Sequence, residues 1–338
     1  MIFSKDKAVA SIRPWGTIDW LFPKLKRKHW DLISCVSFEE RSTALAEWCA
    51  TRRVSPNTVL LLRIRDPVSR FTEEIEKRTD SNEVRLREVF PKAFIHTDDL
   101  LAHSSAWNSV LSQKVANTTS VLLDISTLPK RVFLFLVKRL LAREEVENLV
   151  VCYSRAKTYP EGPLTQDSDP VEALPGYARI SEGTATSLVV GVGYVAFDIN
   201  QLIEQVKAVN LHFLFPFPPG SPAFRRNWRL IRQLTPDAPI ALEIQRIHAM
   251  DMFAALDWLK RVGADSDGQI GMVALGPKPH SLAMGLASLT LGEGSQVMYS
   301  QPKIYHPDYS MGVAMKGLDQ PEIYAYCLKR NGVSYVSG

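Results

Sequence analysis

Apolar residues along the chain fall into short runs, separated by longer stretches with helical periodicity. The runs are rich in Val, Leu and Ile, as in strands that are covered on both faces. In the first part of the chain they lie at 31–37, 58–64, 121–125 and 148–153. In the second part they lie at 187–197, 211–215, 239–244, 270–275 and 296–299, with helices expected near 199–208, 222–234, 248–262 and 279–290. Alternating strands and helices predict an α/β fold built on parallel sheets.

The two parts of the chain share sequence patterns in the same order. The pattern Y-S-x-x-K-x-Y occurs at 153–159 and at 299–305, and each copy follows a Pro-Lys pair, at 129–130 or 277–278. Matched patterns at matched spacing predict two tandem Rossmann-like halves related by internal duplication. We expect the first half at 1–160 and the second half at 186–338. A Pro/Gly-rich linker is expected between them, at 161–185.

Polar residues follow the predicted strands, at the edge where an open parallel sheet binds its ligand. In the first half they are Ser37, Glu39, Arg41, Asp124, Ser126, Thr127 and Lys130. In the second half they are Asp198, Asn200, Gly276, Lys278 and Ser281. Helices that begin at these turns direct free backbone N–H groups and positive dipole ends into the same crevice. The pattern predicts a site for a nucleotide or another phosphorylated ligand.

The Pro-Lys turns also have a purely structural interpretation. Proline is common in the first turn of a helix, and Ser, Thr and Asp are ordinary N-caps. A lysine in the first turn is mildly unfavourable to the helix, however. Because Lys130 and Lys278 stand at both turns, a ligand-binding role is favoured over capping alone.

Composition narrows the classes of function. The chain has 338 residues, 46% of them hydrophobic, which suffices for two domains with cores, and its net charge of +4 implies no global field for a polyanion. Local basic clusters with aromatic residues, at 24–30 and 224–229, leave contact with nucleic acid open. The four cysteines lack C-x-x-C spacing and are expected to be buried free thiols of a reducing compartment. No apolar stretch approaches a membrane span, so we expect a cytoplasmic protein without membrane contact.

Other motifs are weaker. The stretch GVGYVA at 191–196 fits G-x-G-x-x-A, but neither Asp nor Glu stands near 212–216, where a dinucleotide-binding turn needs one. His248 and Asp251 share a helical face without a third ligand at metal spacing. We predict no metal site and no cofactor.

The stretches SCVSFEER at 34–41 and DISTLPK at 124–130 resemble the two ligand-facing motifs of CARF-type Rossmann-like domains, which sense cyclic oligoadenylates in prokaryotic defence. In this resemblance Asp124, Ser126, Thr127 and Lys130 fill the later motif and Ser37 the first loop. The chain departs from the pattern at Leu128 and Pro129, where glycines are usual, and at Met272, which aligns with Asp124. The resemblance implies a ligand bound between two halves, with the signal passed to a partner protein or to self-association.

Three hypotheses remain open on the sequence. The first is a sensor or regulatory subunit that binds a nucleotide without turnover. The second is an enzyme that cleaves a nucleotide phosphoester or glycosidic bond, with Lys130 stabilising negative charge and Asp124 or Glu39 as acid or base. The third is a structural subunit of a multi-protein complex.

Overall fold

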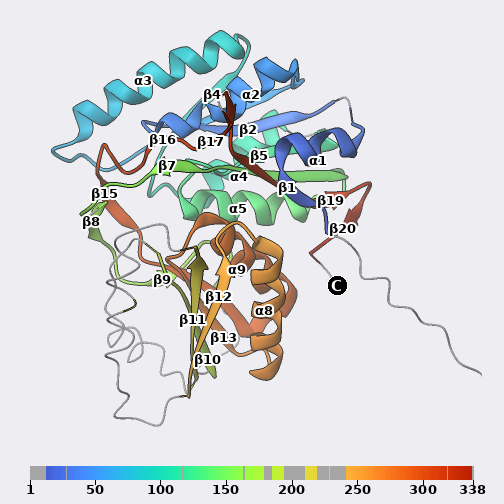
Figure 1. Cartoon of the computed structure of the whole chain (residues 1–338), viewed down its shortest axis with the longest axis vertical. Helices are drawn as coiled ribbons and strands as arrows, with labels where there is room; N and C mark the ends of the chain where they lie inside the picture. The colour runs from blue at the N-terminus through green and yellow to red at the C-terminus, as the bar shows by residue number, and fades with distance from the viewer. Residues whose placement is uncertain are drawn as a thin grey trace, which may run out of the picture.

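The computed structural model of the chain describes residues 13–27, 29–115, 117–162, 164–178, 185–193, 210–218, 228, 241–317 and 319–336. Two sheets lie one above the other along the long axis of the molecule, each flanked by helices (Figure 1). The mixed α/β architecture expected from the alternating pattern is confirmed.

The first sheet is built mainly from the first half of the chain. Its strand order is β1 (Trp15–Thr17), β19 (Ile323–Arg330), β6 (Asn148–Ser154), β5 (Ser120–Asp124), β2 (Asp31–Val36), β3 (Val59–Arg65) and β4 (Phe94–Asp99), with β20 (Val333–Ser334) beside β19. The strands from β4 to β6 are parallel, whereas β19 and β1 are antiparallel to their neighbours. The helices of this half are α1 (Ile18–Leu25), η1 (Glu40–Ser42), α2 (Ala44–Arg52), α3 (Thr72–Val89), α4 (Ser104–Lys114) and α5 (Lys130–Leu141).

The second sheet has the order β12 (Ala241–His248), β11 (Asn210–Phe217), β10 (Ser187–Gly191), β13 (Ile270–Ala274), β14 (Ser295–Tyr299) and β9 (Glu172–Ala173). All of these strands are parallel except β9, which pairs with β14 in the antiparallel sense. The described helices of this half are α8 (Met252–Asp265), α9 (Lys278–Leu291) and η2 (Gly292–Gly294). Three small ladders complete the fold: β7 (Ala156–Thr158) with β16 (Met311–Val313), β8 (Thr165–Ser168) with β15 (Pro302–Tyr305), and β17 (Met315–Lys316) with β18 (Gln320–Pro321).

The parallel strands of both sheets follow one topology. The order is β4-β3-β2-β5-β6 in the first half and β12-β11-β10-β13-β14 in the second. Counted along the chain among the parallel strands of each half, this order is third, second, first, fourth and fifth. In this doubly wound order the crevice for a ligand opens at the carboxyl ends of the strands, between the first and fourth. The shared order agrees with two Rossmann-like halves, while their origin by duplication stays a prediction.

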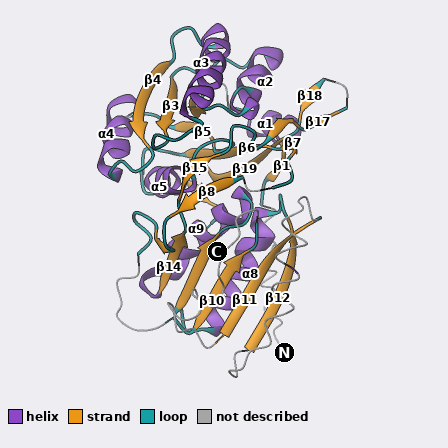
Figure 2. Cartoon of the chain, turned by 90° about the vertical axis from the view of Figure 1, so that its left-hand side faces the viewer, coloured by secondary structure: helices purple, strands orange, loops and turns teal. Residues whose placement is uncertain are grey.

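Helices α5 and α9 join the two halves. Both lie between the sheets in Figures 1 and 2, and buried residues of both halves form one continuous apolar core around them. Gly285 allows the close approach, because a Cβ there would lie 2.6 Å from Cδ2 of Leu134 on α5. The hydroxyl of Tyr177 donates a 2.9 Å hydrogen bond to the carbonyl oxygen of the same leucine. The turns that precede α5 and α9 are therefore held face to face.

The chain differs from the expected division in two places. Strand β19 returns to the first sheet, so the end of the range 186–338 belongs structurally to the first half. The stretch 161–185, expected as a linker, contributes β8 and the edge strand β9. Pro- and Gly-rich composition disfavours long elements, but short strands still form where an open sheet edge such as β14 offers partners. Strand β4 escaped prediction because its sequence, FIHTDD, is polar and half exposed at the other edge.

All four cysteines are free and buried, as predicted. Among the described residues, every helix is too short or too polar to span a membrane.

Candidate functional site

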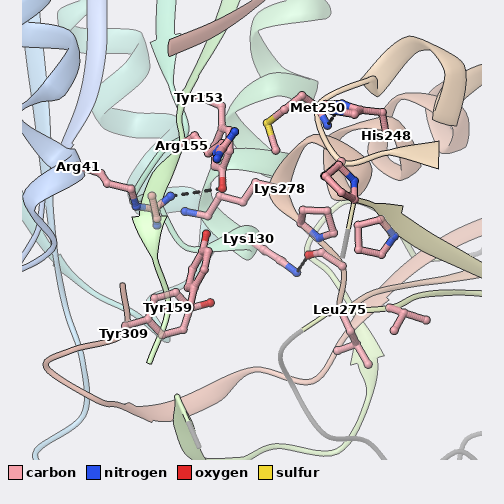
Figure 3. A pocket seen from close by; sticks show the side chains of 18 of the residues that line it. Arg41, Lys130, Tyr153, Arg155, Tyr159, His248, Met250, Leu275, Lys278 and Tyr309 are labelled. Carbon is pink, nitrogen blue, oxygen red and sulfur yellow. Dashed lines mark hydrogen bonds between the residues drawn. The ribbon is translucent and has the colours of Figure 1, made fainter. Parts of the chain in front are cut away.

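A cavity of about 280 Å³ lies between the two halves, where the carboxyl ends of both sheets meet. Figure 3 shows basic and aromatic side chains that converge on it. The first half contributes Arg41, Lys130, Tyr153, Arg155, Lys157 and Tyr159, and the second half contributes Gly193, His248, Met250, Gly276, Lys278, Tyr299 and Tyr309. The cavity lies at the strand ends, where the sequence predicts a ligand site, and its use by a ligand stays a prediction.

The two Pro-Lys turns face each other and exchange hydrogen bonds. The Nζ atom of Lys130 donates to the carbonyl oxygens of Ala274 and Gly276, at 2.6 and 2.7 Å. The Nζ atom of Lys278 donates at 2.7 Å to the carbonyl oxygen of Ser126. Each lysine thus crosses from the first turn of its own helix to the turn of the opposite half, and both line the cavity.

Burial makes both lysines easy to deprotonate. Removal from water lowers the pKa of Lys278 to about 7, against the opposing influence of Glu39. Burial also lowers the pKa of Lys130 well below its ordinary value, and the positive charge of Lys278 adds to that effect. An anion in the cavity would reverse both effects, because it restores a partner to the charged form.

Arg41 and Glu39 form a buried ion pair beside the cavity. Their side chains are only 2% and 6% exposed, and Nη2 of Arg41 lies 2.6 Å from Oε2 of Glu39. Arg41 also donates to the hydroxyl of Tyr153 and the carbonyl oxygen of Ser154, at 3.3 and 3.2 Å. The hydroxyl of Ser310 completes the group through bonds with both members of the pair. Arg41 therefore reaches the cavity in a fixed orientation.

Asp124 and Ser126 face the interior rather than the cavity. The carboxylate of Asp124 accepts from the backbone N–H of Ser126 at 2.9 Å, from its hydroxyl, and from the Ser34 hydroxyl at 3.1 Å. The hydroxyl oxygen of Ser126 in turn accepts a 2.7 Å hydrogen bond from the backbone N–H of Ser154. Burial raises the pKa of Asp124 above its usual range although these bonds oppose the rise. This network shapes the turn that positions Lys130.

A second cavity, of about 70 Å³, adjoins the first and shares Lys130, Lys278, Tyr299 and Tyr309 with it. Ser37, Glu39 and Thr127 line this second cavity, as does Asp66 at the end of β3. Burial, reinforced by the charges of Glu76 and Glu39, raises the pKa of Asp66 to about 7. Sequence reasoning missed Asp66, although its place directly after a strand was the available signal.

The repeated Y-S-x-x-K-x-Y pattern also lies at the site. Tyr153, Lys157 and Tyr159 line the first cavity, and Tyr299 lines both cavities. Lys303 instead forms a 2.6 Å ion pair with Asp169. The two copies of the pattern are therefore used differently.

The second half approaches the cavity with backbone more than with side chains. A Cβ atom at Gly193 would collide with the carbonyl oxygen of Leu275, so only glycine lets the end of β10 lie against the turn at Gly276. Ser281 is buried and donates to the carbonyl oxygens of Gly276 and Pro277 at 3.4 and 3.3 Å, outside the cavity lining. The predicted residues Asp198 and Asn200 lie outside the described residues.

Over the described ranges, no group of three or more His, Cys, Asp or Glu side chains is arranged to hold a metal ion. Asp251 instead caps α8, accepting from the N–H of Ala254 at 2.9 Å. The arrangement as a whole offers buried cations, tyrosine rings and backbone groups to a ligand.

Fold and site together define an α/β protein with two Rossmann-like halves around a basic cavity. No protein-family model matches the sequence, and the search of curated proteins found no match. Among solved structures the fold is similar to that of a type III CRISPR defence DNA nuclease activated by cyclic oligoadenylate, with a TM-score of 0.52 and 8% sequence identity. The likeness covers 80% of this chain, which spans about 65% of the length of the nuclease. At this identity the likeness concerns the fold alone.

Proposed function

We propose that this chain binds a nucleotide or another phosphorylated ligand in the cavity between its halves, and that it acts as a sensor or regulatory subunit of a defence system. The observation that carries the proposal is the charge of the cavity. Its described lining includes five Lys and Arg side chains and no carboxylate. Two of these cations, Lys130 and Lys278, are half-buried and donate to carbonyl oxygens, with no carboxylate within ion-pair distance among the described residues, an arrangement that an anionic ligand would stabilise.

The aromatic part of the lining supports a nucleotide over a simple phosphate. Tyr153, Tyr159, Tyr299 and Tyr309 all line the cavity. Tyrosine rings are stacking surfaces for nucleobases, while Arg and Lys are suited to phosphate oxygens. A nucleotide carries both a base and a phosphate, so it can contact the tyrosine rings and the cations of the lining at once.

Cyclic oligoadenylate is the first ligand to test, because the structural neighbour is activated by it. The cavity, at about 280 Å³, is near the lower end of the range for pockets that hold small-molecule ligands, about 300–1,000 Å³. A linear dinucleotide or a ring of several nucleotides therefore needs the halves to separate, whereas a mononucleotide is the smallest of the three classes and the closest in size to the cavity. Isothermal titration calorimetry with all three classes tests the proposal. Binding of none of them contradicts it and favours the structural-subunit hypothesis.

Ligand affinity is expected to fall as the pH rises. A phosphodiester ligand needs the charged form of Lys278, whose pKa is about 7 in the free protein. Between pH 6 and pH 8 the charged fraction, and with it the affinity, falls about tenfold. A ligand without a terminal phosphate should be used, because a phosphomonoester titrates near pH 6 itself.

The matched control for this pH dependence is Lys278→Arg, since a guanidinium stays charged throughout the range. The variant should lose the part of the slope between pH 6 and 8 that comes from Lys278. An unchanged slope in the variant contradicts the assignment of the titration to Lys278.

One observation favours an enzyme as the second candidate. Asp66 and Lys278 both line the second cavity and both have a pKa of about 7, which suits a general acid and base near neutral pH. If the chain cleaves a phosphoester, incubation should consume the bound ligand, and Asp66→Asn should abolish consumption while binding persists. Chromatography of the ligand after incubation measures this. An intact ligand with wild-type protein excludes turnover and leaves the sensor.

A further inference from the structure

A basic surface surrounds α1, outside the lining of both cavities. Figure 1 shows α1 beside the β19–β20 hairpin. Cations from three separate segments meet there, and we call them the α1 patch: Lys24, Lys26, Arg27, Arg52, Arg53 and Arg330.

An ion pair and two hydrogen bonds link these segments. Arg52, at the end of α2, lies 2.7 Å from the carboxylate of Asp19 on α1. Arg330, at the end of β19, donates at 3.2 Å to the carbonyl oxygen of Lys24. Arg27 donates at 2.7 Å to the side-chain oxygen of Asn331. The end of α2 and the β19–β20 hairpin therefore both contact α1, although the three segments are distant in sequence.

Most of the charge in the patch is uncompensated. Over the part of the chain that the structure describes, Lys24, Lys26, Arg53 and Arg330 have no carboxylate within ion-pair distance. The first three of these side chains are exposed. Exposed cations without partners are available to phosphate groups of a ligand.

Two of the cations occupy positions that local structure does not favour. Lys26 and Arg53 end α1 and α2 with φ angles of 52° and 55°. Glycine adopts this left-handed conformation at lower cost than any residue with a Cβ. A cation near a helix C-terminus complements the dipole, but a lysine or arginine one turn earlier would do so without backbone strain. Each charge therefore lies at the exposed end of a helix, at a position that has a cost in backbone energy.

The patch also offers an aromatic ring. Trp20 is 48% exposed, and Nζ of Lys24 lies 3.5 Å from its ring centroid. If Lys24 moves to a phosphate, one face of the indole becomes open to a base. Cations interleaved with an exposed aromatic ring are the elements that proteins use to bind single strands, in which bases are free to stack.

We propose that the α1 patch binds single-stranded nucleic acid, with backbone phosphates on its cations and a base stacked on Trp20. This site is independent of the ligand cavity. The stretch 24–30 is a basic and aromatic cluster in the sequence, and the fold brings Arg52 and Arg330 into contact with α1.

Fluorescence anisotropy of a labelled oligothymidine of about 16 nucleotides tests the proposal. Lys24→Glu/Lys26→Glu/Arg53→Glu should weaken binding by at least about tenfold and should reduce the slope of log affinity against log salt by about two. The matched control is Lys77→Glu/Lys92→Glu/Lys316→Glu, which changes the net charge equally at exposed positions outside the patch. It should stay within about twofold to threefold of wild type, since distant exposed charges are screened.

Trp20 gives a test that does not depend on charge. Trp20→Ala should weaken binding by about fivefold or more, whereas Trp20→Phe, which still stacks, should remain close to wild type. Equal losses in the two triple variants overturn the proposal. So does loss of oligonucleotide binding in Lys130→Met/Lys278→Met, which would place the nucleic acid in the cavity instead. Binding of phosphatidylserine vesicles in place of the oligonucleotide also overturns it and assigns the surface to a membrane.

Discussion

Replacing Lys130 and Lys278 together by Met is expected to weaken ligand binding by at least about 100-fold, because each charge-assisted hydrogen bond contributes about 1.5–3 kcal/mol. Both ammonium groups line the cavity, and each is already oriented across it by carbonyl oxygens of the opposite half. A ligand phosphate would meet two cations that need no further desolvation. Loss of both leaves the buried Arg41 and the exposed Arg155 and Lys157 as the cations of the described cavity lining.

The double variant should nevertheless stay folded. Methionine keeps the length of the side chain, and a buried charge with lowered pKa is replaced by an apolar group of similar volume, a change that is often neutral or stabilising. Calorimetric titration measures the loss of binding, and thermal melting followed by circular dichroism confirms the fold. Lys303→Met is the matched control, because Lys303 pairs with Asp169 outside both cavities. Unchanged affinity in a folded double variant contradicts the proposed site.

Glu39→Gln is expected to destabilise the chain by about 3–5 kcal/mol, the cost of leaving a buried ion-pair partner uncompensated. Arg41 is 2% exposed and has no other carboxylate within ion-pair distance in the described chain. The amide keeps the shape of the side chain, so the loss reports charge rather than packing. Urea denaturation measures the change in the free energy of unfolding.

A double-mutant cycle separates the pair from its surroundings. Glu39→Gln/Arg41→Met removes both charges and should recover most of the stability that the single variant loses. Glu74→Gln, which breaks an exposed helical pair with Arg78, should cost less than about 1 kcal/mol. A Glu39→Gln variant as stable as this control would show that the pair contributes nothing.

Local sequence patterns predicted the fold class because strands buried on both faces and helices that follow them leave periodic signals. The runs at 31–37 and 148–153 became β2 and β6 within one residue of their predicted ends. The half-exposed edge strand β4 and the pairing of β19 with the first sheet left no such signal. Their formation depends on partners that are distant in the sequence.

The sequence by itself determined that Lys130 and Lys278 stand at matched turns after parallel strands, because strand ends and helix starts are local features. Only the tertiary structure decided what those lysines contact. The packing of α5 against α9 turns each lysine toward the carbonyl oxygens of the other half. Hydrogen bonds from Ser34 and Ser126 hold Asp124 inward, and the folded strand β3 ends with Asp66 on the wall of the second cavity. The ends of strands and helices depend on neighbouring residues in the sequence. The contacts that Lys130 and Lys278 make depend on how the two halves pack together.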